Sequence, residues 1–509
     1  MMPRTLWLGD YRVSRNQLSL IFGVDDLRFA TSYWYGDIDL LDLRATLGDE
    51  FFRKLVFHIA AFEANKLGSL APDLFDLGPF SDLYTDRFAT LWSTVFARVW
   101  AQWRYEHDCP DYLGPQILGR TGRTIPPVGN RPPSPIETLA MCGGGKDSLV
   151  ALRLLERAGI PYASLGYAHS IYGNPEAQHS LLDRLLDCCQ PRGRYRQWVY
   201  DDFLHSPVIA LRPDFGARSL TAAETPSSVF GALPLMLAAG FKNLVVGHER
   251  SADTGNLVWT VTGEDVNHQW GKSLEAERLL NEYIRSELIE DVSYFSVLKP
   301  LYDVAIFALL TEHEDAVART HSCNLRKPWC EECAKCAYVW INYMAYLSPD
   351  VVLPMFRTNL LDNPTNELAF RQMLGLEDHT PFECVGQVDE ARLAFELCRR
   401  RGLRGLAMEI FEGEVPAVDV AEILERRGYV DLSNSGIPAE LRPRLDPLLL
   451  CAQNSVDHLR RSLEQSTPDS DSSSITLLIK PAEDAADQFV TGVGVATERV
   501  EAQISVSTR

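Results

Sequence analysis

Short apolar runs alternate with longer amphipathic stretches through the middle of the chain. The apolar runs at 136–141, 162–167, 196–200 and 243–247 have the length and composition of buried strands. The stretches at 148–158, 176–188 and 227–239 carry apolar residues at helical spacing, and Gly240 closes the last of them. This alternation predicts an α/β fold with a parallel sheet and helices on both faces. It covers a predicted domain at 136–347.

The pattern before this domain is different. Residues 12–14 and 17–22 predict strands around a turn, and apolar spacing over 51–67 predicts a helix. We therefore expect an N-terminal α+β domain over residues 1–120. Residues 121–135 contain five prolines and two glycines, which is typical of an exposed connector.

The pattern after the middle domain is mostly helical. Apolar spacing at 366–374, 388–400 and 418–426 predicts a helical C-terminal domain over 348–464. A polar stretch then introduces residues 465–509, which we predict to be a flexible tail. Within this tail, 475–479 has the composition of a short strand.

Length, composition and charge narrow the class of protein. With 509 residues the chain predicts two or three domains, and 46% apolar with 23% charged residues is typical of a soluble globular protein. No apolar run is long enough to span a membrane and no secretory segment is recognisable at the start, so we expect a cytoplasmic protein without a membrane partner. The net charge of −20 and the lack of a long basic run argue against nucleic acid as a partner.

One glycine-rich turn carries the strongest chemical signal. It reads Gly143-Gly144-Gly145-Lys146-Asp147-Ser148 and lies between the strand predicted at 136–141 and the helix predicted at 148–158. Glycines let the backbone turn sharply, and the free N–H groups of a helix N-terminus attract phosphate. Lys146 adds a cation and Ser148 a hydroxyl, so the turn predicts a nucleotide-handling enzyme. The alternative is an ordinary strand-to-helix turn.

The position of this turn predicts where the ligand site lies. In a parallel sheet, ligands bind outside the carboxyl ends of the strands. The loops at 142–148, 168–175 and 247–256 follow three predicted strands and should face the same crevice. The Walker motif is absent, because Asp147 rather than Ser or Thr follows the lysine.

Four of the eleven cysteines lie within 14 residues, at Cys323, Cys330, Cys333 and Cys336. Four thiolates at this spacing predict a tetrahedral zinc site, and four protein ligands leave zinc no open position for catalysis. An iron–sulfur cluster is one alternative, although the bacterial ferredoxin pattern would put its fourth cysteine where Trp340 stands. Free thiols are the other alternative. Disulfides are not expected in a cytosolic chain.

The glycine turn resembles the PP-loop of the N-type ATP pyrophosphatases, with Gly143 where the first serine of that motif usually stands. Those enzymes release pyrophosphate and leave AMP on a substrate oxygen. The turn and the cysteine cluster together resemble the 7-cyano-7-deazaguanine synthases, which are roughly half this length.

A closer resemblance is to the MurL family of UDP-N-acetylmuramoyl-L-alanyl-L-glutamate epimerases. It spans about residues 136–400 and is carried, in chain order, by the segments 143–148, 248–256, 266–273, 322–336 and 381–386. The resemblance implies a PP-loop ATP-binding domain and a nucleotide-linked peptide as substrate, UDP-MurNAc-L-alanyl-L-glutamate. It also implies ATP, Mg²⁺ and a structural Zn²⁺.

The reaction that the resemblance implies explains why ATP is needed. A glutamate α-proton beside a carboxylate is weakly acidic, because its removal builds a dianion. An acyl-adenylate lacks that charge, so a base on one face and an acid on the other can invert the α-carbon. Hydrolysis would then release the other epimer.

Roles for individual residues follow from the resemblance. Gly143 to Gly145 and Ser148 would cradle the phosphates, and Lys146 would stabilise charge on them. Asp147 would help to place Mg²⁺, or it caps the helix. Further candidates for the ATP site are His169, Glu249, Arg250 and Asn256, with a salt-bridged loop as the alternative for the last three.

The substrate side has its own candidates. Asn267, His268 and Lys272 suit the carboxylate or phosphates of the substrate, with a purely structural role as the alternative. Cys384 is the candidate for inverting the α-carbon, because cysteine pairs catalyse cofactor-independent racemisation elsewhere, and Glu383 lies beside it. A buried structural cysteine is the alternative.

Two other functions remain open at this point. One is a PP-loop adenylating synthetase or ligase that ends in an amide, nitrile or thiolated product. The other is a nucleotide-sensing or scaffold protein with a degenerate PP-loop. The sequence makes no prediction of oligomeric state.

Overall fold

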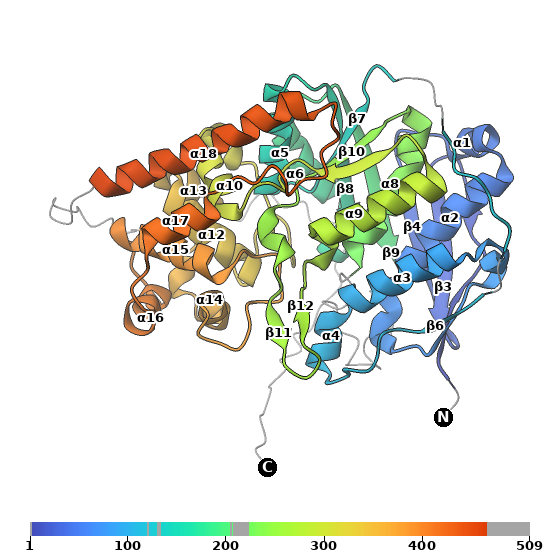
Figure 1. Ribbon diagram of the computed structural model, residues 1–509, viewed down its shortest axis with the longest axis horizontal. Helices are drawn as coiled ribbons and strands as arrows, with labels where there is room; N and C mark the ends of the chain where they lie inside the picture. The colour runs from blue at the N-terminus through green and yellow to red at the C-terminus, as the bar shows by residue number, and fades with distance from the viewer. Residues whose placement is uncertain (1–2, 120–121, 130–133, 204–205, 207–222, 466–509) are drawn as a thin grey trace, which may run out of the picture.

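The computed structural model describes residues 3–119, 122–129, 134–203, 206 and 223–465 (Figure 1). The predicted tail lies outside the described residues except for Gln465, and so does the strand predicted at 475–479. Part of the predicted connector at 121–135 also lies outside them. No helix in the described part of the chain is long and apolar enough to cross a membrane.

An eleven-stranded sheet organises the described N-terminal and middle regions. Its strand order is β13-β10-β7-β8-β9-β4-β3-β1-β5-β6, with β2 beside β3. The strands are β1 (Thr5–Leu8), β2 (Arg12–Val13), β3 (Gln17–Val24), β4 (Leu27–Tyr35), β5 (Leu74–Asp76), β6 (Gln116–Leu118), β7 (Thr138–Cys142), β8 (Tyr162–His169), β9 (Gly193–Asp201), β10 (Asn243–Val246) and β13 (Ser293–Ser296). A separate hairpin pairs β11 (Leu257–Trp259) with β12 (Glu264–Val266).

Helices surround this sheet. In the N-terminal and middle regions they are α1 (Leu40–Leu47), α2 (Asp49–Ala64), α3 (Asp86–Val99), α4 (Ala101–Glu106), α5 (Lys146–Arg157), α6 (Pro175–Leu186), α8 (Glu224–Ala239), α9 (Leu274–Tyr283), α10 (Asp303–Leu310) and α11 (Glu314–Val317). The C-terminal helices are α12 (Ala334–Tyr346), α13 (Pro349–Val352), α14 (Glu367–Met373), α15 (Val388–Arg400), α16 (Leu406–Glu414), α17 (Val420–Arg427) and α18 (Arg442–Gln465).

The predicted α/β class is confirmed, but the sheet is mixed rather than parallel throughout. The four predicted strands of the middle region form β7, β8, β9 and β10, and with β13 they are parallel. The antiparallel pair of β4 with β9 then joins the N-terminal strands to this half, as Tyr33 opposite Val199 shows. The predicted N-terminal and ATP-binding domains therefore share one sheet, while the exact domain boundaries stay predictions.

Two hydrophobic cores lie on opposite faces of the sheet, because successive side chains of a strand point to opposite sides. Ala140 and Cys142 of β7 belong to a core that continues through α5, α10 and α12 into the C-terminal helices. Leu139 belongs to the other core, with α2, α3 and α8. In Figure 1 the orange and red C-terminal helices accordingly lie at one side and the blue N-terminal elements at the other. The sheet is covered by helices on both faces, as the sequence predicts.

The parallel half places the predicted loops together. Strands β10, β7 and β8 are neighbours, and their carboxyl ends lie at one edge of the sheet. The loops that follow these strands contain the glycine turn, the segment after His169 and the segment after Gly247. A ligand site is expected at this shared edge.

Candidate functional site

The glycine turn links β7 to α5. Gly144 has a φ of +87°, a conformation that favours glycine, and the Gly143 N–H donates to Ser148 Oγ at 3.1 Å. Gly145 is the N-cap of α5, so the capping role considered for Asp147 falls to a residue without a side chain. Within the described chain no side chain caps this helix. The amides of its first turn are thus available to an anion.

A second segment packs directly on the glycine turn. The His321 N–H donates to the Gly144 carbonyl at 2.8 Å. A Cβ on Gly144 would lie 2.2 Å from the His321 ring, and one on Gly145 would lie 2.6 Å from Ser322 Oγ. The turn and this wall therefore both require glycine at 144, whereas a side chain at 145 would only have to displace Ser322 Oγ. No sequence motif pointed to His321.

Lys146 is buried, with 1% of its side chain exposed. Its Nζ lies 2.6 Å from Asp147 Oδ1 and 2.5 Å from Asp303 Oδ1, above the ring of Phe307. Burial alone would lower the pKa of Lys146, but the charges of Asp147 and Asp303 outweigh it and hold the pKa well above its usual value. The ammonium group is therefore charged and directed at these two carboxylates. Asp303 opens α10 and carries no sequence signal of its own.

Asp303 connects the glycine turn to the C-terminal helices. Tyr338 of α12 donates to Asp303 Oδ2 at 2.8 Å, and the Asp303 N–H donates to Ser251 Oγ at 3.1 Å. Ser251 in turn donates to Glu390 Oε1 of α15 at 2.8 Å. Burial, together with the charge of Asp303, raises the pKa of Glu390 to about 8. A continuous buried network thus joins Lys146 to α12 and α15.

The loop after β10 carries a second set of predicted residues. Glu249 is 4% exposed; burial would raise its pKa, but Lys272 and Lys146 lower it to about 2. Lys299, fully buried, donates from Nζ to the carbonyls of Glu249 and Lys272, each at 2.8 Å. This buried lysine, which sequence reasoning missed, fixes the two loops relative to each other.

Arg250 points elsewhere. Its Nη2 lies 3.1 Å from Asp431 Oδ2, and its guanidinium stacks over the Tyr302 ring at 4.8 Å. The structure thus places Arg250 against the C-terminal region rather than in the cavity described next.

Four predicted residues line one cavity of about 390 Å³: His268, Lys272, Glu383 and Cys384. Asn324 also lines it and donates from Nδ2 to Glu383 Oε2 at 3.0 Å. The cavity lies between the loop after β12 and the segment before α15, which are far apart in the sequence.

Two predicted residues build the wall of this cavity without lining it. Asn256 Nδ2 donates to Thr380 Oγ1 at 3.0 Å and to the Pro381 carbonyl at 2.8 Å, and its Oδ1 accepts from the His268 N–H at 2.9 Å. Asn267 Nδ2 donates to the Ala252 carbonyl at 2.9 Å. Both amides hold backbone segments in place.

Cys384 has an unusual electrostatic environment. Burial would raise the pKa of its thiol, but the charge of Lys272 and a hydrogen bond from His268 outweigh burial and lower the pKa to about 6. Lys335 Nζ also donates to the Cys384 carbonyl. At neutral pH this cavity therefore holds a thiolate beside an ammonium group, which is the state in which cysteine acts as base or nucleophile.

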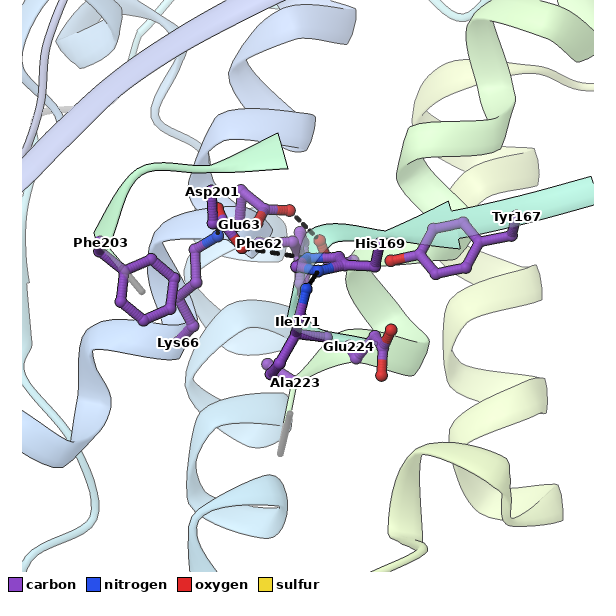
Figure 2. A pocket seen from close by; sticks show the side chains of 11 residues that line it. Phe62, Glu63, Lys66, Tyr167, His169, Ile171, Asp201, Phe203, Ala223 and Glu224 are labelled. Carbon is purple, nitrogen blue, oxygen red and sulfur yellow. Dashed lines mark hydrogen bonds and ion pairs between the residues drawn. The ribbon is translucent and has the colours of Figure 1, made fainter. Parts of the chain in front are cut away.

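His169 lies in a different, small cavity of about 20 Å³ (Figure 2). Its Nε2 is 3.0 Å from Asp201 Oδ2, and its Nδ1 accepts from the Ile171 N–H at 3.1 Å. Burial would lower the pKa of His169, but Asp201 raises it. Ligand atoms of Glu63, His169 and Asp201 lie within 4.8 Å of one another, yet the ammonium of Lys66 already pairs with both carboxylates. The lining of this cavity does not include the glycine turn.

The four clustered cysteines converge as predicted. Their sulfur atoms lie within 4.8 Å of one another, with 4.0 Å between Cys323 and Cys333 and 3.8 Å between Cys330 and Cys336. Four sulfurs about 2.3 Å from one tetrahedral ion would be about 3.8 Å apart. Backbone N–H groups also donate to the Cys323 sulfur at 3.3 and 3.2 Å. The cluster can bind a metal such as zinc.

Comparison with known proteins places the chain in a family. A model of the MurL N-terminal domain matches residues 226–297, and a model of the MurL C-terminal domain matches residues 318–411. These segments contain His268, Lys272, Glu383 and Cys384 of the cavity, together with the cysteine cluster. No solved structure matches the chain.

Three curated relatives carry the name UDP-N-acetyl-alpha-D-muramoyl-L-alanyl-L-glutamate epimerase. The protein from Micromonospora sp. is 32% identical over 61% of this chain and 67% of its own length. The protein from Salinispora tropica is 30% identical, over 60% and 65%, and that from Xanthomonas oryzae pv. oryzae is 28% identical, over 56% and 61%. On these matches the chain belongs to the MurL family of UDP-N-acetyl-alpha-D-muramoyl-L-alanyl-L-glutamate epimerases.

Proposed function

We propose that the chain inverts the terminal glutamate of UDP-N-acetylmuramoyl-L-alanyl-L-glutamate, as an ATP-dependent epimerase of peptidoglycan precursor synthesis. The observation that carries the proposal is the cavity of about 390 Å³, where Cys384 and Lys272 meet in a member of this family. A thiolate beside a fixed cation suits the removal of an α-proton from a substrate that carries negative charge. A cytoplasmic location stays a prediction.

The glycine turn would bind ATP as a PP-loop does. The uncapped first turn of α5 and the glycine backbone would bind the phosphates. Lys146 would exchange a carboxylate partner for a phosphate oxygen, because its Nζ is already committed to Asp147 and Asp303. Asp147, with 22% of its side chain exposed, would then be free to help place Mg²⁺.

Adenylation would make the inversion feasible. An oxygen of the glutamate α-carboxylate bonds to the α-phosphorus of ATP, and the bond to the leaving pyrophosphate breaks. The Cys384 thiolate then takes the α-proton: the C–H bond breaks, an S–H bond forms, and the electron pair moves onto the carbonyl oxygen. A proton returned to the opposite face inverts the centre, and Glu383 is our candidate for that second group. Water finally attacks the acyl carbon, the bond from that carbon to the bridging oxygen breaks, and AMP and the inverted acid are released.

The metal centre would hold the cavity wall. Its neighbours Asn324 and Lys335 reach Glu383 and the Cys384 backbone. We propose structural zinc here, because four thiolates leave it no position for substrate.

The test is a direct assay of purified protein with ATP, Mg²⁺ and the UDP-muramoyl dipeptide. We expect AMP, pyrophosphate and D-glutamate at the terminal position, and we expect Cys384→Ala to lose the inversion. Cys451→Ala is the matched control, since Cys451 is exposed and lies on α18. Release of AMP and pyrophosphate with the L-configuration fully retained would reject the epimerase and favour an adenylating synthetase.

A further inference from the structure

The ring of His268 is hydrogen-bonded to a side chain from a distant part of the sequence. Its Nδ1 lies 2.6 Å from Oε1 of Gln102, which belongs to α4 in the N-terminal region. The residues that line the cavity come from positions 171 to 384. The N-terminal region therefore contributes to the environment of Cys384 through this contact.

The direction of this hydrogen bond is fixed by a third residue. Gln102 Nε2 donates to Glu106 Oε1 at 2.8 Å, and an ionised carboxylate can only accept. The amide oxygen of Gln102 must therefore face His268. An amide oxygen also only accepts, so Nδ1 of His268 carries the proton. Nε2 is then the ring nitrogen left to face Cys384.

We propose that Gln102 is a positioning residue that holds His268 in the tautomer able to accept the Cys384 proton. The thiol S–H bond breaks, an N–H bond forms at Nε2, and the electron pair stays on sulfur. Because a hydrogen bond from an imidazolium is stronger than one from a neutral ring, the Gln102 oxygen favours the charge-separated pair. Activated nucleophiles in general have the same arrangement: a nucleophile, a base that takes its proton, and a third group that orients the base. The inference rests on the proposed function in one respect: the target of this thiolate is the glutamate α-proton.

Replacing Gln102 removes none of the other groups that face Cys384. They are Lys272, Lys335, the neighbouring Glu383 and Tyr172, whose hydroxyl donates to Glu224. A change in the thiol titration on replacing Gln102 therefore reports on His268.

The experiment measures how fast iodoacetamide alkylates Cys384 as a function of pH, by mass spectrometry of the peptide that contains it. For the unaltered protein we expect half-maximal rate near pH 6, where the thiol has its pKa of about 6. Gln102→Met removes the acceptor and should raise this midpoint by about one unit. Gln102→Glu keeps an oxygen and adds charge, so its midpoint should stay or fall. Gln190→Met is the matched control, at an exposed glutamine, and should change nothing.

Two results would overturn the inference. One is a Gln102→Met profile that overlays that of the unaltered protein. The other is an upward shift of the same size for Gln102→Met and Gln102→Glu, which would indicate lost packing rather than a lost acceptor. The readout needs neither ATP nor substrate, so it stands or falls independently of the epimerase assay. In that assay Gln102→Met should lower kcat at least about tenfold and leave KM nearly unchanged.

Discussion

Replacing Lys146 by methionine should destabilise the protein strongly, apart from any effect on ATP. Methionine retains an unbranched side chain of similar length but removes the ammonium. Only 1% of the Lys146 side chain and 3% of the Asp303 side chain are exposed. The substitution therefore leaves the Asp303 carboxylate buried without its cation.

The size of the effect follows from the two contacts at 2.6 and 2.5 Å. A hydrogen bond to a charged group contributes about 1.5–3 kcal/mol, and removing one partner of a buried pair costs about 3–5 kcal/mol. Asp147 is 22% exposed and regains some water, so most of the loss comes from Asp303. We expect Lys146→Met to lower the free energy of unfolding by about 3–5 kcal/mol. Against a total of about 5–15 kcal/mol this is a large fraction.

A double-mutant cycle gives the test, with urea unfolding followed by tryptophan fluorescence at neutral pH. The variants are Lys146→Met, Asp303→Asn and the two together. The amide introduced by Asp303→Asn can still accept from Tyr338 and carries no charge to strand, so the double variant should be more stable than Lys146→Met. We expect a coupling free energy of about 1–3 kcal/mol between the two positions.

Two outcomes would refute this reasoning. If Lys146→Met unfolds within about 0.5 kcal/mol of the unaltered protein, the ammonium is not held between buried carboxylates. If the three free energies simply add, Asp303 is not its partner. The double variant should remain unable to release AMP from ATP, which separates the structural role of Lys146 from its role toward phosphate.

Three further predictions concern the cavity and the metal centre. Lys272→Met removes the cation that lowers the pKa of Cys384, so the acidic limb of the activity profile should move to higher pH; an unmoved limb contradicts the assignment. Asn256→Ala removes the hydrogen bonds that hold the cavity wall at Thr380 and Pro381, so it should raise KM for the dipeptide more than KM for ATP. Equal effects on the two KM values would place Asn256 at the nucleotide. Cys330→Ser should reduce bound zinc, measured by elemental analysis, and lower Tm by several degrees, whereas zinc content equal to that of a Cys109→Ser control rules out ligation.

The middle of the fold could be predicted because its signals are local. Each apolar run from 136 to 247 formed a strand, and the cysteine spacing already implied convergence. The mixed sheet could not be predicted. The antiparallel pairing of β4 with β9 joins residues about 170 positions apart, and no pattern within either strand indicates this pairing.

The site divides in the same way. Cys384, Lys272 and His268 belong to motifs, and the structure brings them to one cavity. Gln102 and Asp303 act through contacts across 166 and 157 positions and lie in no motif. Such partners are fixed by tertiary packing, so only the structure shows them.

The central claim is that ATP activates the same carboxylate whose α-carbon is inverted. It is tested most directly by labelling the α-carboxylate oxygens of the terminal glutamate with a heavy oxygen isotope and analysing AMP after turnover. With the reaction run in deuterated water, the account predicts one labelled oxygen in the phosphate of each AMP. It also predicts deuterium from the solvent at the α-carbon of the inverted product. Inversion accompanied by AMP without label would contradict the account, in which water attacks the acyl carbon and the carboxylate oxygen leaves with AMP.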